Sequence, residues 1–124
     1  MSAKVDMALV LELGEPDFVI EMVELFVQSS AHEICEIRGA LGRADGATLV
    51  GAAHKLKGAC LGMFATTMAE LAGLIEREGR AGRLEAAGQH VVRLELAFDE
   101  TAPQMLAAAR GLDGAQAPVV FNSA

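Results

Sequence analysis

One short stretch of the chain, His54-Lys55-Leu56-Lys57-Gly58, has residue types at a spacing that could do chemistry. A neutral imidazole is a good nucleophile near neutral pH, and a lysine one helical turn later could lie beside a bound anion. The surrounding sequence has the periodicity of an amphipathic helix, whose predicted buried stripe is Leu49, Ala52, Ala53, Leu56, Ala59, Cys60 and Met63. At about 100° per residue, His54 falls about 170° from the centre of that stripe. We therefore expect His54 to face solvent.

The helix face around His54 is small and partly apolar, whereas a solvated face more often carries Glu, Lys and Gln. Gly51 and Gly58 flank the histidine on this face. Glycine inside a helix costs about 1 kcal/mol relative to alanine. The two glycines therefore need a reason, and close approach of another molecule to His54 is one.

Composition limits the class of protein. A chain of 124 residues predicts one domain, and the lack of Trp and Tyr among abundant aliphatic residues favours helices over a β-sandwich. The net charge of -7 disfavours binding to nucleic acid or to an anionic membrane surface. No signal-type apolar core and no apolar run of about 18 residues occur, so we expect a cytoplasmic protein.

Turn and capping residues divide the chain into successive helices. Pro16 after Glu15 is typical of a helix start, Asp45 of an N-cap, and the spacing from Thr67 to Glu70 of a capping box. The expected elements are a short apolar segment, 7–13, and four substantial helices, 15–42, 45–63, 67–79 and 84–111. These elements predict an all-α fold, an antiparallel up-and-down four-helix bundle with a short additional N-terminal helix. The bundle would occupy residues 1–111, followed by a flexible tail at 112–124.

The other polar residues have simpler interpretations. His32 and His90 lack a neighbourhood like that of His54, and we expect both to be noncatalytic. Cys35 and Cys60 lie in apolar helical patterns without ligand spacing, which predicts buried thiols in a reducing compartment. The acidic side chains are expected to form a solvated face, namely Glu33, Glu36, Glu76 and Glu78. We expect no metal site.

Residues 53–59, AHKLKGA, resemble the signature of histidine-containing phosphotransfer (HPt) domains, the four-helix-bundle carriers of two-component phosphorelays. The resemblance covers roughly residues 7–110. Similar features outside the signature are the acidic-Pro-Asp-Phe start at 15–18, Phe26, Ala40-Leu41 followed by Asp45, and the segment 71–76.

This resemblance implies that His54 accepts a phosphoryl group from the aspartate of one receiver domain and passes it to another. Lys57 would offset the charge of the phosphoryl oxygens, and Gly58 would leave room for the incoming receiver. Val50 and Leu61 would be docking residues, because a small apolar rim excludes water. The chain itself would bind no cofactor, since Mg²⁺ is expected in the acidic pocket of the receiver.

The expected partners are response-regulator receiver domains and a hybrid histidine kinase, and we expect the protein to be a monomer. The chain has no Gly-rich phosphate loop or Walker lysine, so we expect a phosphohistidine carrier without kinase or ATPase activity. Phe64 stands where the family commonly has a turn glycine. This departure leaves an alternative open, a helical adaptor or inhibitor that binds a receiver domain or histidine kinase without being phosphorylated.

Overall fold

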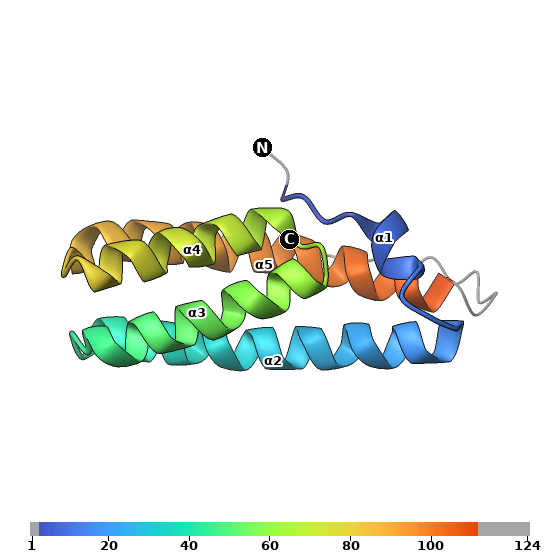
Figure 1. Cartoon of the computed structure of the whole chain (residues 1–124), viewed down its shortest axis with the longest axis horizontal. Helices are drawn as coiled ribbons and strands as arrows, with labels where there is room; N and C mark the ends of the chain where they lie inside the picture. Colours follow the sequence, from blue (N-terminus) through green and yellow to red (C-terminus); the bar gives the residue numbers. More distant parts are fainter. Residues whose placement is uncertain (1–2, 112–124) are drawn as a thin grey trace.

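The computed structural model describes residues 3–111, and these residues form only helices and their connections. The five helices in Figure 1 are α1 (Met7–Leu11), α2 (Pro16–Gly42), α3 (Gly46–Gly62), α4 (Thr66–Arg80) and α5 (Leu84–Gly111). The predicted all-α fold is confirmed. The expected tail, 112–124, lies outside the described residues. None of the helices in the described part is long and apolar enough to span a bilayer.

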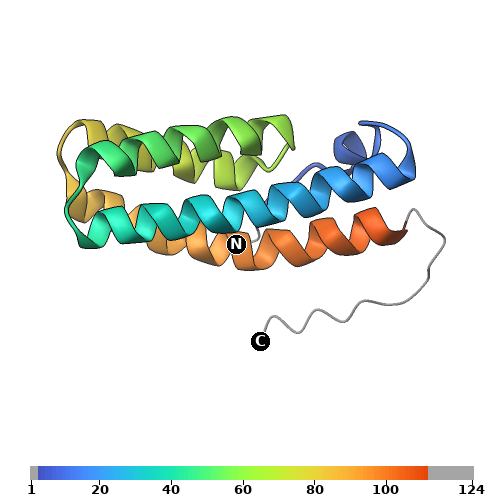
Figure 2. The ribbon, with the colours of Figure 1, turned by 90° about the horizontal axis from the view of Figure 1, so that it is seen from below.

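Helices α2 to α5 alternate in direction and form a closed four-helix bundle. Each packs against its neighbours along the chain, and α5 also packs against α2, which closes the ring. The longest helices are α2 and α5, and the start of α2 and the end of α5 extend beyond α3 and α4 at one end of the bundle (Figure 1). Helix α1 contacts α2 and α5 at this end (Figure 2).

The helix starts follow the capping signals with one exception. Pro16 is the first residue of α2, and the Asp45 carboxylate accepts a hydrogen bond from the Thr48 backbone N–H at 3.1 Å. The predicted capping box at Thr67 is wrong, because α4 begins one residue earlier after Ala65. The Thr67 hydroxyl instead accepts a hydrogen bond from the Lys4 backbone N–H at 2.7 Å, which ties the N-terminal segment to the start of α4.

Phe64 forms the turn between α3 and α4 with a left-handed backbone, φ 57°. This conformation costs a non-glycine residue roughly 1–2 kcal/mol, which explains why glycine is favoured there. Two backbone hydrogen bonds hold the turn: the Ala65 N–H donates to the Cys60 carbonyl, and the Asp6 N–H donates to the Phe64 carbonyl, both at 2.9 Å. The N-terminal segment therefore stabilises the turn through the hydrogen bond from Asp6.

The apolar stripes meet in one core, which includes Leu49, Leu56, Met68, Ile75, Val91, Leu94 and Met105. Most of the predicted stripe of α3 is buried, but Ala59 is exposed, because it falls at the edge of that stripe at about 100° per residue. Cys60 is buried, and burial raises its pKa to about 12, whereas Cys35 is exposed, contrary to prediction. Helix α5 continues through Pro103 without ending there.

Candidate functional site

His54 lies on the outer face of α3, as predicted, with 65% of its side chain exposed. Its position follows from the buried face of the helix, since Ala53 is fully buried and the next residue projects about 100° away from it. The imidazole is therefore accessible to a macromolecular partner, although one edge of the ring is held by the protein.

Glu76 of α4 holds that edge. Its Oε2 lies 3.0 Å from Nδ1 of His54, and the whole residue is only 7% exposed. The prediction that Glu76 belongs to a solvated face is wrong, because Glu76 stands four residues after Ala72 and three before Gly79, both buried on α4. Glu33 and Glu78 are also mostly covered, with side chains 13% and 12% exposed.

Two cations share the Glu76 carboxylate with His54. Lys57 Nζ lies 2.8 Å from Oε1, and Arg80 donates a 2.8 Å hydrogen bond from Nη2 to Oε2. The two contacts are equally short, but Lys57 reaches the carboxylate from α3 and Arg80 from α4, the helix that carries Glu76. The Lys57 ammonium, followed by the Arg80 guanidinium and His54, lowers the pKa of Glu76 to about 2, against the opposing effect of desolvation. Glu76 is thus a carboxylate at neutral pH.

The charge of Glu76 decides which nitrogen of neutral His54 carries the proton. A carboxylate only accepts hydrogen bonds, so the contact with Oε2 assigns the proton to Nδ1. The lone pair then resides on Nε2, which points away from Glu76. This arrangement resembles other sites in which a carboxylate fixes a histidine tautomer and stabilises positive charge that develops on the ring.

A close approach of α3 and α4 brings these groups together. A Cβ added at Gly79 would lie 2.9 Å from Val50 Cγ2 and 3.3 Å from Leu49 Cδ2, so only glycine fits there without a shift. Six residues before Gly79, the Lys57 stem passes Gly73, where an added Cβ would be 3.5 Å from Lys57 Cδ, an ordinary contact. The two glycines of α4 thus lie under side chains of α3.

The predicted docking residues differ in exposure. Leu61 is 59% exposed, whereas Val50 is half-buried because it packs over Gly79. Gly51 and Gly58 are exposed, and a Cβ at either would meet no described atom within 4 Å apart from the adjoining residues and backbone of its own helix. Nothing within this part of the chain therefore requires glycine at these positions.

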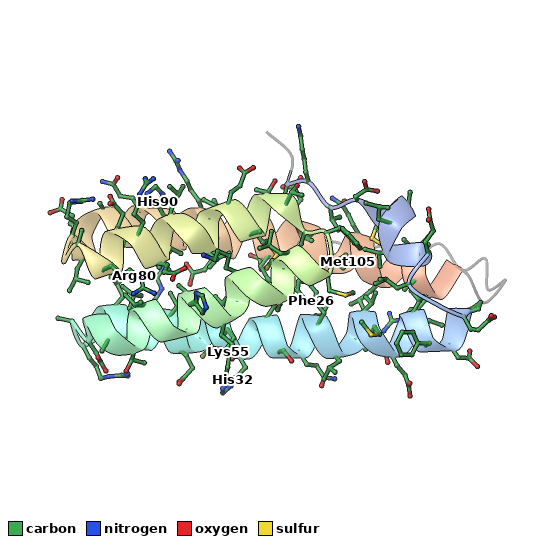
Figure 3. The ribbon with its side chains drawn as sticks, viewed as in Figure 1. Phe26, His32, Lys55, Arg80, His90 and Met105 are labelled. Carbon is green, nitrogen blue, oxygen red and sulfur yellow. The ribbon has the colours of Figure 1, made fainter. Side chains whose placement is uncertain are left out.

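Lys55 lies on another side of α3 from His54. Its ammonium is 3.5 Å from Oε2 of Glu33 on α2, while Arg80 lies between α4 and α3 (Figure 3). His32 and His90 lie on opposite sides of the bundle in the same view. Within residues 3–111, no three His, Cys, Asp or Glu side chains are placed to hold a metal ion.

The fold and this site define a class of protein: a helical bundle that presents a carboxylate-held histidine on its surface. The family model described as Hpt domain matches residues 21–110, so the chain belongs to the Hpt domain family. It has a phosphotransfer role in two-component signalling, in which Hpt domains are carriers that interact with receiver domains and histidine kinases. Comparisons with curated proteins and with solved structures found no match.

Sequence reasoning missed Glu76 and Arg80. Their signal is nevertheless present in α4, where Glu76 continues the spacing of the buried residues Ala72 and Gly79. A charged residue on a buried stripe needs a partner, and Arg80 at the i+4 position supplies one. The link to α3 has no such local signal, because it depends on how the two helices pack.

Proposed function

We propose that His54 accepts a phosphoryl group on Nε2 from a receiver-domain aspartate and passes it to the aspartate of another receiver. The 3.0 Å contact between Nδ1 and Glu76 carries this proposal, because it leaves the lone pair on Nε2 of a side chain that is 65% exposed. The Nε2 lone pair would form the bond to phosphorus while the bond from phosphorus to the aspartate oxygen breaks. The leaving carboxylate would take that electron pair, and the Nδ1 proton would stay in place.

Glu76 would stabilise the product because the ring becomes positively charged when Nε2 bonds to phosphorus. The same charge makes the imidazole a good leaving group when the phosphoryl group moves on. One carboxylate can thus support transfer in both directions. The mechanism requires no proton transfer to or from His54.

Lys57 would supply positive charge to the phosphoryl oxygens. In the unphosphorylated protein its ammonium pairs with Glu76, so it must turn away from that carboxylate to reach a group on Nε2. Its stem crosses Gly73, and a flexible lysine can make this movement. We expect the chain to bind no cofactor, with Mg²⁺ held by the receiver.

The docking surface would consist of Val50, Gly51, Gly58 and Leu61 around the histidine. The exposed Leu61 offers apolar area, and the two open glycines let the receiver backbone come close to the imidazole. Receiver domains, and a hybrid histidine kinase that carries one, are the proposed partners. We also propose that the protein is a monomer in the cytoplasm. Its net charge of -7 disfavours binding to nucleic acid.

A transfer assay tests this function. A panel of phosphorylated receiver domains should label the wild-type protein, His32→Gln and His90→Gln, but not His54→Gln, and the label should be acid labile. Label on His54→Gln, or acid-stable label, would contradict the proposal. Persistent receiver binding by His54→Ala, together with no transfer from any receiver to wild type, would instead support the adaptor.

A further inference from the structure

The Glu76 carboxylate has two cationic partners, Lys57 and Arg80, in addition to His54. Lys57 from α3 occupies Oε1, while Arg80 from α4 and His54 share Oε2. Of the two cationic side chains, Arg80 is the more exposed, at 62% against 34% for Lys57. A carboxylate that is only 7% exposed needs a positive partner, but two cationic side chains are more than one negative charge requires.

The two cations are not equivalent partners of Glu76. Arg80 stands on the same helix, four residues later, and makes an aligned hydrogen bond, so it can hold the carboxylate without help from α3. Lys57 reaches Glu76 from the neighbouring helix α3 and ends in a point charge on a flexible stem. Lys57 is therefore the partner that can leave, and Arg80 is the partner that can stay.

We propose that Arg80 is a positioning residue of the phosphoryl-transfer site, which keeps Glu76 in place against His54 while Lys57 turns to the phosphoryl group. The inference rests on the proposed function of His54. In this proposal the two cations have different roles. Lys57 contacts the phosphoryl group, and Arg80 compensates the charge of the buried Glu76 carboxylate. Without Arg80, the departure of Lys57 would leave Glu76 with His54 as its sole partner among the contacts described.

The Lys57→Ala variant allows a test that needs no phosphoryl donor, because it reproduces the departure of Lys57 from Glu76. Nitrogen-15 NMR of the imidazole reports which ring nitrogen of His54 carries the proton. We expect Lys57→Ala to keep the Nδ1–H tautomer and Lys57→Ala with Arg80→Gln to lose it. The matched control is Lys57→Ala with Arg77→Gln, since Arg77 is an exposed arginine on the same helix that makes no described ion pair. This control should keep the tautomer.

Transfer kinetics give the second readout. Arg80→Gln alone should slow phosphoryl transfer about tenfold without weakening receiver binding, the effect of losing one charge-assisted hydrogen bond. Arg77→Gln should leave the rate unchanged, and Arg80→Lys should restore part of it. Circular dichroism and thermal unfolding would establish that each variant folds.

Either of two results would overturn the role of Arg80: a tautomer that survives Lys57→Ala with Arg80→Gln, or one already lost in Lys57→Ala. An unchanged transfer rate in Arg80→Gln would also overturn it. If wild type accepts no phosphoryl group from any receiver, the function of His54 fails instead, and the tautomer measurement still decides whether Arg80 positions Glu76.

Discussion

Oε2 of Glu76 lies 3.0 Å from Nδ1 of His54, and this contact makes the two nitrogens of one ring chemically different. In the neutral imidazole Nδ1 carries the proton that the carboxylate accepts and Nε2 carries the lone pair, on a side chain that is 65% exposed. The two residues are 22 positions apart in the sequence and come from neighbouring antiparallel helices. Packing of α3 against α4 therefore sets the chemistry of the histidine.

Replacing Glu76 with Gln should allow both neutral tautomers of His54. The amide has about the same shape but no charge, so it neither requires a proton on Nδ1 nor stabilises positive charge on the ring. We expect a mixture of tautomers by nitrogen-15 NMR and transfer slowed by about 10- to 100-fold. Glu78→Gln is the control, because Glu78 lies on the same helix as Glu76 but pairs with Arg83, in the connection between α4 and α5. Equal transfer rates in the two variants would show that Glu76 has no part in the chemistry.

Gly58→Ala should move stability and transfer in opposite directions. Alanine improves an exposed helix interior by about 0.5–1 kcal/mol, and apart from its own stretch of helix no described atom lies within 4 Å of the added methyl. The same methyl would stand one turn from His54 and obstruct a docked receiver, so transfer should fall about tenfold. Urea unfolding and transfer kinetics measure the two effects.

Gly42→Ala provides the comparison for this variant, since Gly42 ends α2 and an added Cβ also meets open space. It should leave transfer unchanged. A Gly58→Ala protein that transfers at the wild-type rate would mean that the glycine does not serve receiver approach.

Gly79→Ala should push α3 and α4 apart. The added Cβ would lie 2.9 Å from a methyl of Val50, whose β-branched side chain is stiff, so we expect a loss of about 1–3 kcal/mol in the free energy of unfolding. Gly73→Ala on the same helix makes only an ordinary contact and should be neutral or stabilising. Urea unfolding distinguishes the two variants. Equal stability would contradict the close approach of the helices at Gly79.

The stability given by Glu76 should depend on acid pH. The pKa of Glu76 is about 2 in the folded protein, below its ordinary value of 4.5. A lowered folded-state pKa stabilises the folded state fully above the unfolded value, and this contribution disappears as pH falls from about 4.5 to about 2. The difference in unfolding free energy between wild type and Glu76→Gln should thus shrink over that acid range. A difference that stays constant down to pH 2 would argue against the ion cluster.

Local signals predicted most of the fold. Pro16 and Asp45 mark helix starts where the structure has them, and the periodicity of α3 placed His54 outside and Leu56 inside. These inferences succeeded because caps and amphipathic stripes are encoded within a few residues. The start of α4 was misplaced because Thr67 binds Lys4, a partner 63 positions away.

Only part of the site could be predicted, because some of its contacts join residues that are distant in the sequence. The spacing of His54 and Lys57 within one helix indicates their shared face, whereas the contact with Glu76 depends on the distance between two helices. That distance follows from Gly79 under Val50, a feature that periodicity does not reveal. Cys35 was misjudged because it lies beside an apolar stripe without belonging to it.

The most direct test of this account identifies the atom that carries the phosphoryl group. Wild-type protein labelled with nitrogen-15 in its imidazole rings would be phosphorylated by a receiver domain and studied by phosphorus and nitrogen NMR. The account predicts a phosphorus–nitrogen coupling to Nε2 of His54, with a proton retained on Nδ1. A phosphoryl group on Nδ1, or on any residue other than His54, would contradict it.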